Sequence, residues 1–164
     1  MDTKILGLLL PVVFILHNIE EYRSFEDFKA FYFKTIHVKL RHRKVFGFAL
    51  LILTLLVSLI CIANYLATNS FLGFATTIVA MSLLINGIQH SVCSCLARKL
   101  LPGTISAIFL LIPCSIVYLA FLEKETQFGI SSIISWSLVS VVSMFVSIHI
   151  SLWIGYFFFK RSFK

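Results

Sequence analysis

Five long apolar segments dominate the sequence and limit the folds open to it. They cover roughly residues 5–21, 45–66, 71–96, 103–122 and 130–159. A helix needs about 20 apolar residues to cross the hydrocarbon core of a bilayer, because each residue advances about 1.5 Å. Turn-forming and charged residues separate the segments, among them Pro102-Gly103 and Glu123-Lys124-Glu125. The pattern predicts an all-α, polytopic membrane bundle of about five transmembrane helices.

The composition supports a membrane protein. Hydrophobic residues make up 59% of the 164 residues, and the mean hydropathy is +0.98, which is too apolar for a soluble domain of this length. The longest polar stretch, Tyr22–Lys44, is itself rich in aromatic residues, so we expect residues 1–164 to form a single integral membrane domain. The first segment has no basic region beyond Lys4 and no small-residue cleavage site before His17. We therefore expect it to be retained and not removed as a signal peptide.

The basic residues are unevenly distributed around the five segments and predict one orientation. If the N-terminus lies outside, all of the 14 lysines and arginines except Lys4 and Lys124 fall on the inner side. The positive-inside rule therefore favours an N-out, C-in arrangement. We expect a multi-pass protein of the cell membrane, whose net charge of +7 needs no nucleic acid as a partner.

The segment between the first and second spans is both aromatic and basic. Its larger side chains recur at about helical spacing, and cations lie between and after them: Phe25, Phe28, Lys29, Phe31, Tyr32, Lys34, Ile36, Lys39 and Arg41-His42-Arg43-Lys44. A helix with one apolar face and one basic face lies in the membrane interface. We expect an amphipathic interfacial helix here, with Lys29–Lys44 contacting anionic lipids of the inner leaflet.

Three ionisable residues lie at the end of the first apolar segment. At about 100° per residue, His17 shares a helix face with Glu20 at i+3 and Glu21 at i+4. Burying one charged side chain in a bilayer costs about 2.5 kcal/mol or more, so the group needs partners, a metal ion or a water-filled cavity. In one interpretation the glutamates lie just beyond the span, among lipid headgroups. We favour the other, a functional site, because of this cost.

The third segment carries polar residues at a matching depth. Ser82, Asn86, Gln89, His90 and Cys93 follow the spacing of one helix face. His17 precedes the basic residue Arg23 and His90 precedes Arg98 by similar distances, which places both histidines about 9–12 Å from the basic boundary. The stripe serves either hydrogen bonds between helices or a site shared with His17, and the equal depth favours a shared site.

A further histidine, His149, lies in the fifth segment. It precedes Lys160 by about 16 Å at helical rise, which is deeper than the other two histidines. Ser143, Ser147 and Ser151 form a row on the nearly opposite face of the same segment. If this row packs against the bundle, as small residues in membranes do, His149 faces away from the site. If it does not, His149 is a further ligand.

Short motifs in the chain resemble those of a known family. His17-x-x-Glu20-Glu21 is similar to the motif that names the HXXEE family, and Asn86-x-x-x-His90 is similar to its later histidine element. The family's Tyr-x-Pro-Gly element reads Leu100-Leu101-Pro102-Gly103 here, so the tyrosine is absent and the Pro-Gly turn is kept. The resemblance implies a small bacterial protein of the inner or plasma membrane, with a site but no assigned reaction.

The residue types at these positions suit a divalent metal, with zinc favoured over iron. Imidazole nitrogen and carboxylate oxygen are ligands of both ions. We predict metal ligands among His17, Glu20, Glu21, His90 and His149. We expect Asn86 and Gln89 to help hold the bound group.

Glu20 and Glu21 are also the predicted catalytic residues. One would complete the coordination while the other acts as general base, and their roles are interchangeable at this point. The hypothesis is an intramembrane metal-dependent enzyme, a membrane metallohydrolase that acts on a lipid-like or apolar substrate through metal-activated water. Two alternatives remain: a cation or proton-coupled transporter that uses the same cluster, and a non-catalytic membrane accessory protein.

Overall fold

The structure is a computed structural model that describes residues 2–32, 40–67, 69–126 and 130–160. This part of the chain is helical and contains no strand. Five helical stretches are long and apolar enough to cross a membrane: Thr3–Arg23, Arg43–Leu66, Ser70–Ala97, Thr104–Thr126 and Ser132–Phe159. The predicted all-α bundle with five such helices is confirmed, whereas its N-out, C-in orientation stays a prediction.

The first span consists of two helices, α1 (Thr3–Gly7) and α2 (Leu9–Arg23). The break between them follows from Pro11. In an uninterrupted helix its ring would clash with the carbonyl group of Gly7, four residues earlier, and it has no N–H to donate. The span is therefore interrupted near Leu8, and α2 continues without a break to the end that carries the site.

A short helix, α3 (Phe25–Tyr32), follows α2 after a single residue. It buries Phe25 and Phe28, while Lys29 pairs with Glu26 at the surface, 3.3 Å between Nζ and Oε2. A helix is therefore present in the first half of this segment, and its place in the membrane interface stays a prediction. Its predicted continuation through Lys34, Ile36 and Lys39 lies outside the described residues.

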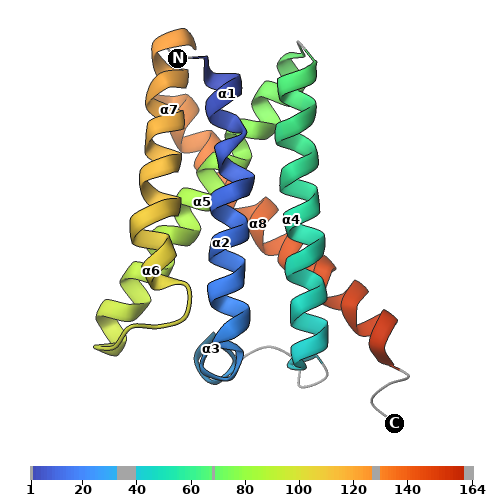
Figure 1. The fold of residues 1–164 in the computed structure, drawn as a ribbon. Coiled ribbons are helices and arrows are strands. Elements are labelled where there is room, and N and C mark those ends of the chain that lie inside the picture. Colours follow the sequence, from blue (N-terminus) through green and yellow to red (C-terminus); the bar gives the residue numbers. More distant parts are fainter. Residues whose placement is uncertain (1, 33–39, 68, 127–129, 161–164) are drawn as a thin grey trace.

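The remaining elements complete the bundle. They are α4 (Arg43–Leu66), α5 (Ser70–Ala97), α6 (Thr104–Ser106), a π-helical turn η2 (Ala107–Leu111), α7 (Ile112–Thr126) and α8 (Ile130–Phe159). In Figure 1, α2, α4 and α7 stand upright, while α5 and α8 run obliquely behind them in opposite directions. α8 packs against both α4 and α5, so it closes the back of the bundle.

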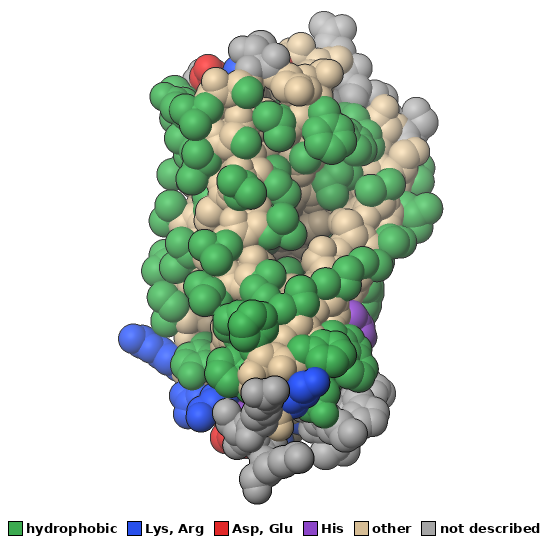
Figure 2. Space-filling view, turned by 90° about the vertical axis from the view of Figure 1, so that its right-hand side faces the viewer, with side chains coloured by type: hydrophobic (Ala, Val, Ile, Leu, Met, Phe, Trp, Pro, Cys, Tyr) green, Lys and Arg blue, Asp and Glu red, His purple; other side chains and the backbone are tan. Residues whose placement is uncertain are grey.

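Two apolar clusters hold the helices together. One includes Leu10, Phe14, Leu111 and Tyr118, and the other joins α3, α4 and α8 through residues such as Val45 and Leu152. Outside these clusters, large apolar side chains cover the surface (Figure 2), as expected for helices in contact with lipid.

Lysine and arginine side chains gather at the end of the bundle that holds α3 (Figure 2). We call this the basic end. Helix ends place these described residues there: Arg23, Arg43, Lys44, Arg98 and Lys160. The N-terminus lies at the opposite end (Figure 1).

Gly155 permits the close crossing of α8 over α4. A Cβ atom at this position would lie 2.9 Å from the backbone oxygen of Val45. We predict that Gly155→Ala lowers the melting temperature in detergent, because a backbone atom cannot move aside as a side chain does. Gly73→Ala is the matched control, since its Cβ would meet nothing closer than Asn64 Oδ1 at 3.8 Å. Circular dichroism measures the melting temperatures. Equal melting temperatures for the two variants would contradict this role of Gly155.

Candidate metal centre

Three buried ionisable side chains meet between α2 and α5. Glu21 Oε1 lies 3.3 Å from His17 Nε2 and 3.0 Å from His90 Nε2. The exposed fractions are 0% for His17, 6% for Glu21 and 3% for His90. We call these three residues the His/Glu trio. The predicted meeting of His17 and His90 at one depth is confirmed by their ring centroids, which lie 4.9 Å apart.

A hydroxyl group lies beside the second nitrogen of each imidazole. Nδ1 of His17 lies 2.9 Å from Ser106 Oγ, and Nδ1 of His90 lies 3.0 Å from the hydroxyl of Tyr32. These contacts fix both rings with Nε2 directed at Glu21. Histidines that bind metals are oriented in the same way, by a hydrogen bond at the nitrogen that does not bind the ion.

The spacing of the three ligand atoms suits a tetrahedral ion. Zinc holds nitrogen and oxygen ligands at about 2.0–2.2 Å, so neighbouring ligand atoms lie about 3.3 Å apart. The separations of 3.0 and 3.3 Å from Glu21 Oε1 are close to this value, and the three atoms all lie within 4.8 Å of one another. The trio could therefore hold a metal ion with little rearrangement and leave a fourth position open.

Asn86, predicted to help hold the bound group, contacts the trio directly. Its Nδ2 lies 3.1 Å from His17 Nε2, the same nitrogen that faces Glu21. One nitrogen cannot accept a hydrogen bond from the amide and donate one to the carboxylate at the same time. A rotation of the amide that turns its oxygen toward the centre removes this conflict, because the N–H of His17 Nε2 then faces oxygen atoms only.

The structure does not bring Glu20 into this group, so its predicted part in metal binding stays a prediction. Its carboxylate accepts hydrogen bonds from three backbone N–H groups at the start of α6: Gly103 at 3.0 Å, Ile105 at 3.3 Å and Ser106 at 2.8 Å. Adjacent residues of a helix point about 100° apart, so Glu20 and Glu21 meet different neighbours. Their roles are therefore not interchangeable, because Glu20 fastens the α6 turn and Glu21 faces the histidines.

The turn that Glu20 fastens is packed against the trio. Gly103 has a φ of 85°, and a Cβ there would lie 2.8 Å from Cε1 of both His17 and His90. Only glycine adopts this backbone conformation without strain. The three motifs noted in the sequence, His17-x-x-Glu20-Glu21, Asn86-x-x-x-His90 and Pro102-Gly103, therefore meet at one point.

The other predicted site residues lie outside the trio. His149 is exposed, and its Nδ1 lies 2.9 Å from the carbonyl oxygen of Phe145 in its own helix. Ser151, of the serine row on the same helix, is buried with 2% exposed. Whether His149 contributes to the site stays a prediction. Gln89 is exposed and its role in holding a bound group stays a prediction.

Sequence reasoning did not assign roles to Tyr32 and Ser106. The spacing predicts Tyr32 as an apolar residue of the interfacial helix, and it predicts Ser106 only as part of a membrane span. No spacing rule connects either residue to a histidine far away in the chain. One feature of the sequence could have indicated Ser106: the Pro102-Gly103 element lies a few residues before it.

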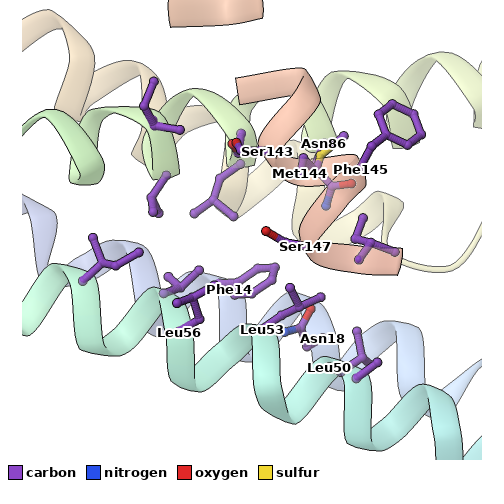
Figure 3. A pocket seen from close by; sticks show the side chains of 18 of the residues that line it. Phe14, Asn18, Leu50, Leu53, Leu56, Asn86, Ser143, Met144, Phe145 and Ser147 are labelled. Carbon is purple, nitrogen blue, oxygen red and sulfur yellow. The ribbon is translucent and has the colours of Figure 1, made fainter. Parts of the chain in front are cut away.

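A large cavity adjoins the trio. It has a volume of about 480 Å³ and lies between α2, α3, α4, α5 and α8, with Glu21, Tyr32 and His90 in its wall. Figure 3 shows Phe14 and Leu53 on one side of this space and Ser147 on the other. His149 and Gln89 also border it. The trio is therefore buried within the protein and yet adjoins a space large enough for a small organic molecule.

The fold and the site define a helical protein with five helices long enough to cross a membrane and a buried His/Glu centre. The chain belongs to the HXXEE family, described as a protein of unknown function with HXXEE motif, and the match covers residues 8–118. The trio, Glu20 and Gly103 lie within this range, whereas α8 and His149 lie beyond it. No curated protein and no solved structure matches the chain.

Substituting each glutamate in turn distinguishes the role of Glu21 from that of Glu20. We predict that Glu21→Gln lowers the metal content of the purified protein, because an uncharged amide is a poorer ligand. Glu20→Gln should keep the metal but lower the melting temperature, since it weakens charge-assisted hydrogen bonds at a helix start, typically worth about 1 kcal/mol. Elemental mass spectrometry and thermal unfolding measure the two effects. Loss of metal from a folded Glu20→Gln variant would contradict the assignment.

Gly103→Ala tests the contact between the turn and the imidazoles. The added methyl group would overlap both rings and strain a positive φ, so we predict lower thermal stability and lower metal content together. Gly7→Ala is the control, because its Cβ would make an ordinary contact of 3.4 Å with Thr76 Cγ2. A Gly103→Ala protein with the metal content and melting temperature of the control would show that the turn does not support the centre.

Proposed function

We propose that this protein is an intramembrane metal-dependent hydrolase that acts on a lipid-like substrate. The observation that carries the proposal is that Glu21 and His90 line a cavity whose wall is otherwise mostly apolar. Two imidazoles and a carboxylate suit a divalent cation, and an apolar cavity suits an apolar substrate. The two features adjoin, so a substrate in the cavity would reach the centre.

The proposed ion is divalent, with zinc favoured over iron. His17 Nε2, His90 Nε2 and Glu21 Oε1 would bind it, which is the three-ligand set of a catalytic zinc site with one position left for water. The ion would supply a Lewis acid that activates this water and polarises the bond to be cleaved.

Glu21 is the proposed proton acceptor. In hydrolysis of an acyl ester or amide, the oxygen of water adds to the carbonyl carbon, the bond to the leaving group breaks, and one proton of the water passes to that group. Among the described residues, Glu21 is the carboxylate that contacts both imidazoles. It would therefore bind the cation through one oxygen and accept the proton through the other.

Tyr32 is the proposed hydrogen-bond donor to the substrate. When Nε2 of His90 binds a cation, the proton of the ring lies on Nδ1, which then donates to the Tyr32 oxygen. The hydroxyl proton of Tyr32 is left free to point into the cavity that Tyr32 lines. Burial and the neighbouring Cys93 and Glu21 raise the pKa of Tyr32, so the phenol stays protonated and can stabilise a developing negative charge.

The cavity supports a transporter or a non-catalytic accessory protein less well than it supports an enzyme. A cation or proton transporter needs polar groups along the whole path across the bundle. Beyond Ser82 and Ser143, the described cavity wall toward the N-terminal end consists of apolar residues. An accessory protein without a reaction needs no cluster of buried ionisable groups, whose burial is costly.

We further propose that the basic end faces the cytoplasm of a bacterial cell and contacts anionic lipids through Lys29–Lys44. Cation–π contacts support this arrangement. Arg43 lies over the ring of Tyr22 at 4.9 Å and Lys160 over that of Phe157 at 5.2 Å, so these cations are held where the headgroups of a bilayer would lie.

Metal content tests the proposed function. We expect one divalent ion per chain in protein purified without chelator, and its loss from the His17→Ala/His90→Ala double variant, because two of three ligands are removed. His149→Ala is the matched control, since His149 is exposed and outside the trio. Elemental mass spectrometry measures the ratio of metal to protein.

Two results would overturn the proposal. One is wild-type protein that is folded and binds no stoichiometric metal after incubation with zinc or iron. The other is a double variant that keeps the same metal content as wild type, which would place the ion elsewhere.

A further inference from the structure

We propose that the cavity beside the trio binds one acyl chain of an amphiphile, with the chain directed from the trio toward the N-terminal end of the bundle. The inference deepens the proposed function and rests on it for the identity of the reacting bond. The substrate class would be an acyl ester or amide whose carbonyl group reaches the trio.

The cavity wall changes from polar to apolar along three of the helices that form it, α2, α5 and α8. On α5, His90, Gln89 and Asn86 line the end of the cavity beside the trio, while Ala75, Phe74 and Phe71 line the far end. On α2, Glu21 and Asn18 give way to Phe14, and on α8, His149 and Ser147 give way to Val139. The α4 wall is apolar throughout, from Ala49 to Ile60. An amphiphile fits this gradient in one direction only.

The far part of the cavity has the length of a lipid tail. Along α5, Ser82 and Phe71 are separated by eleven residues, or about 16 Å at helical rise. Half of the hydrocarbon core of a bilayer, which one acyl chain fills, measures about 15 Å. The volume of about 480 Å³ lies in the range for a drug-sized ligand.

The polar groups in the middle of the cavity wall are already used within the protein. Ser82 Oγ donates to the carbonyl oxygen of Ser140 at 3.3 Å, and Ser143 Oγ donates to the same oxygen at 3.0 Å. Asn18 Nδ2 donates to Thr54 Oγ1 at 2.8 Å. These donors therefore need no hydrogen bond from a bound molecule, and an apolar chain can lie beside them.

The chain can enter from the bilayer. Several large apolar residues of the cavity wall are exposed and not packed inside the bundle: Leu56, Phe71, Phe74, Val139 and Phe145. The face in Figure 2 is hollowed at about mid-height. A lipid tail therefore reaches the cavity sideways, without passing through water.

Photo-crosslinking tests the inference. The probe is a palmitoyl hydroxamic acid with a diazirine at its methyl end, applied to the protein in nanodiscs, because a hydroxamate chelates a metal and the diazirine reports the position of the tail. We expect adducts on residues 71–79 of α5. Ala75→Trp should lose most of them, since the indole fills the far end of the cavity. Ile60→Trp, in the opposite wall, is a second variant in case the first does not fold.

Ala120→Trp is the matched control, because Ala120 lies on the exposed face of α7 and outside the cavity wall. It should give the adducts of wild type. Adducts spread evenly over the exposed faces of α4 and α7, or undiminished in a folded Ala75→Trp or Ile60→Trp protein, would overturn the inference.

Metal content, measured on the same samples, separates this inference from the proposed function. Protein that binds metal but shows no adducts on residues 71–79 would overturn the acyl-chain inference and leave the metal centre standing. Protein that shows these adducts without any metal would support the acyl-chain cavity and overturn the hydrolase.

Discussion

The structure depends on how one buried carboxylate is balanced. Glu21 is 6% exposed, inside a bundle whose surface is covered with apolar side chains. A single charge in such surroundings is unstable without partners. The protein supplies two imidazoles at 3.0 and 3.3 Å, one from the same helix and one from α5. This requirement explains why α2 and α5 approach each other where they do.

Several other features follow from the same requirement. The imidazoles can serve Glu21 only if they are held in one orientation, so Ser106 and Tyr32 contact their second nitrogens. Ser106 is in place because the carboxylate of Glu20 holds the first N–H groups of α6. The consecutive glutamates therefore act at two levels, one on the histidines and the other on the segment that orients them. Gly103 completes the arrangement because it brings the backbone against both rings.

Much of this arrangement could be predicted from the sequence. The apolar segments gave the five helices, and counting residues from the basic boundary placed His17 and His90 at one depth. The rotation of each helix about its axis could not be predicted, because it depends on packing against neighbours that are distant in the sequence. For this reason the sequence does not distinguish the neighbours of Glu20 from those of Glu21, and it leaves two orientations open for His149. The contact of Tyr32 with His90 could not be predicted either, because the two residues lie 58 positions apart in the sequence.

The π-helical turn η2 has a consequence for the fourth span. In an α-helix, residues five apart point about 140° away from each other, so Ser106 and Leu111 would face different sides. A π turn closes hydrogen bonds between residues five apart and brings them onto one side. Ser106 can thus face His17 while Leu111 and Tyr118 enter the apolar core. The π turn sets the rotation of α7 relative to α6, so that one side of the span serves both the polar site and the apolar core. The orientation of Ser106 toward His17 therefore depends on the number of residues between Gly103 and Ile112 as well as on the side chains of the site.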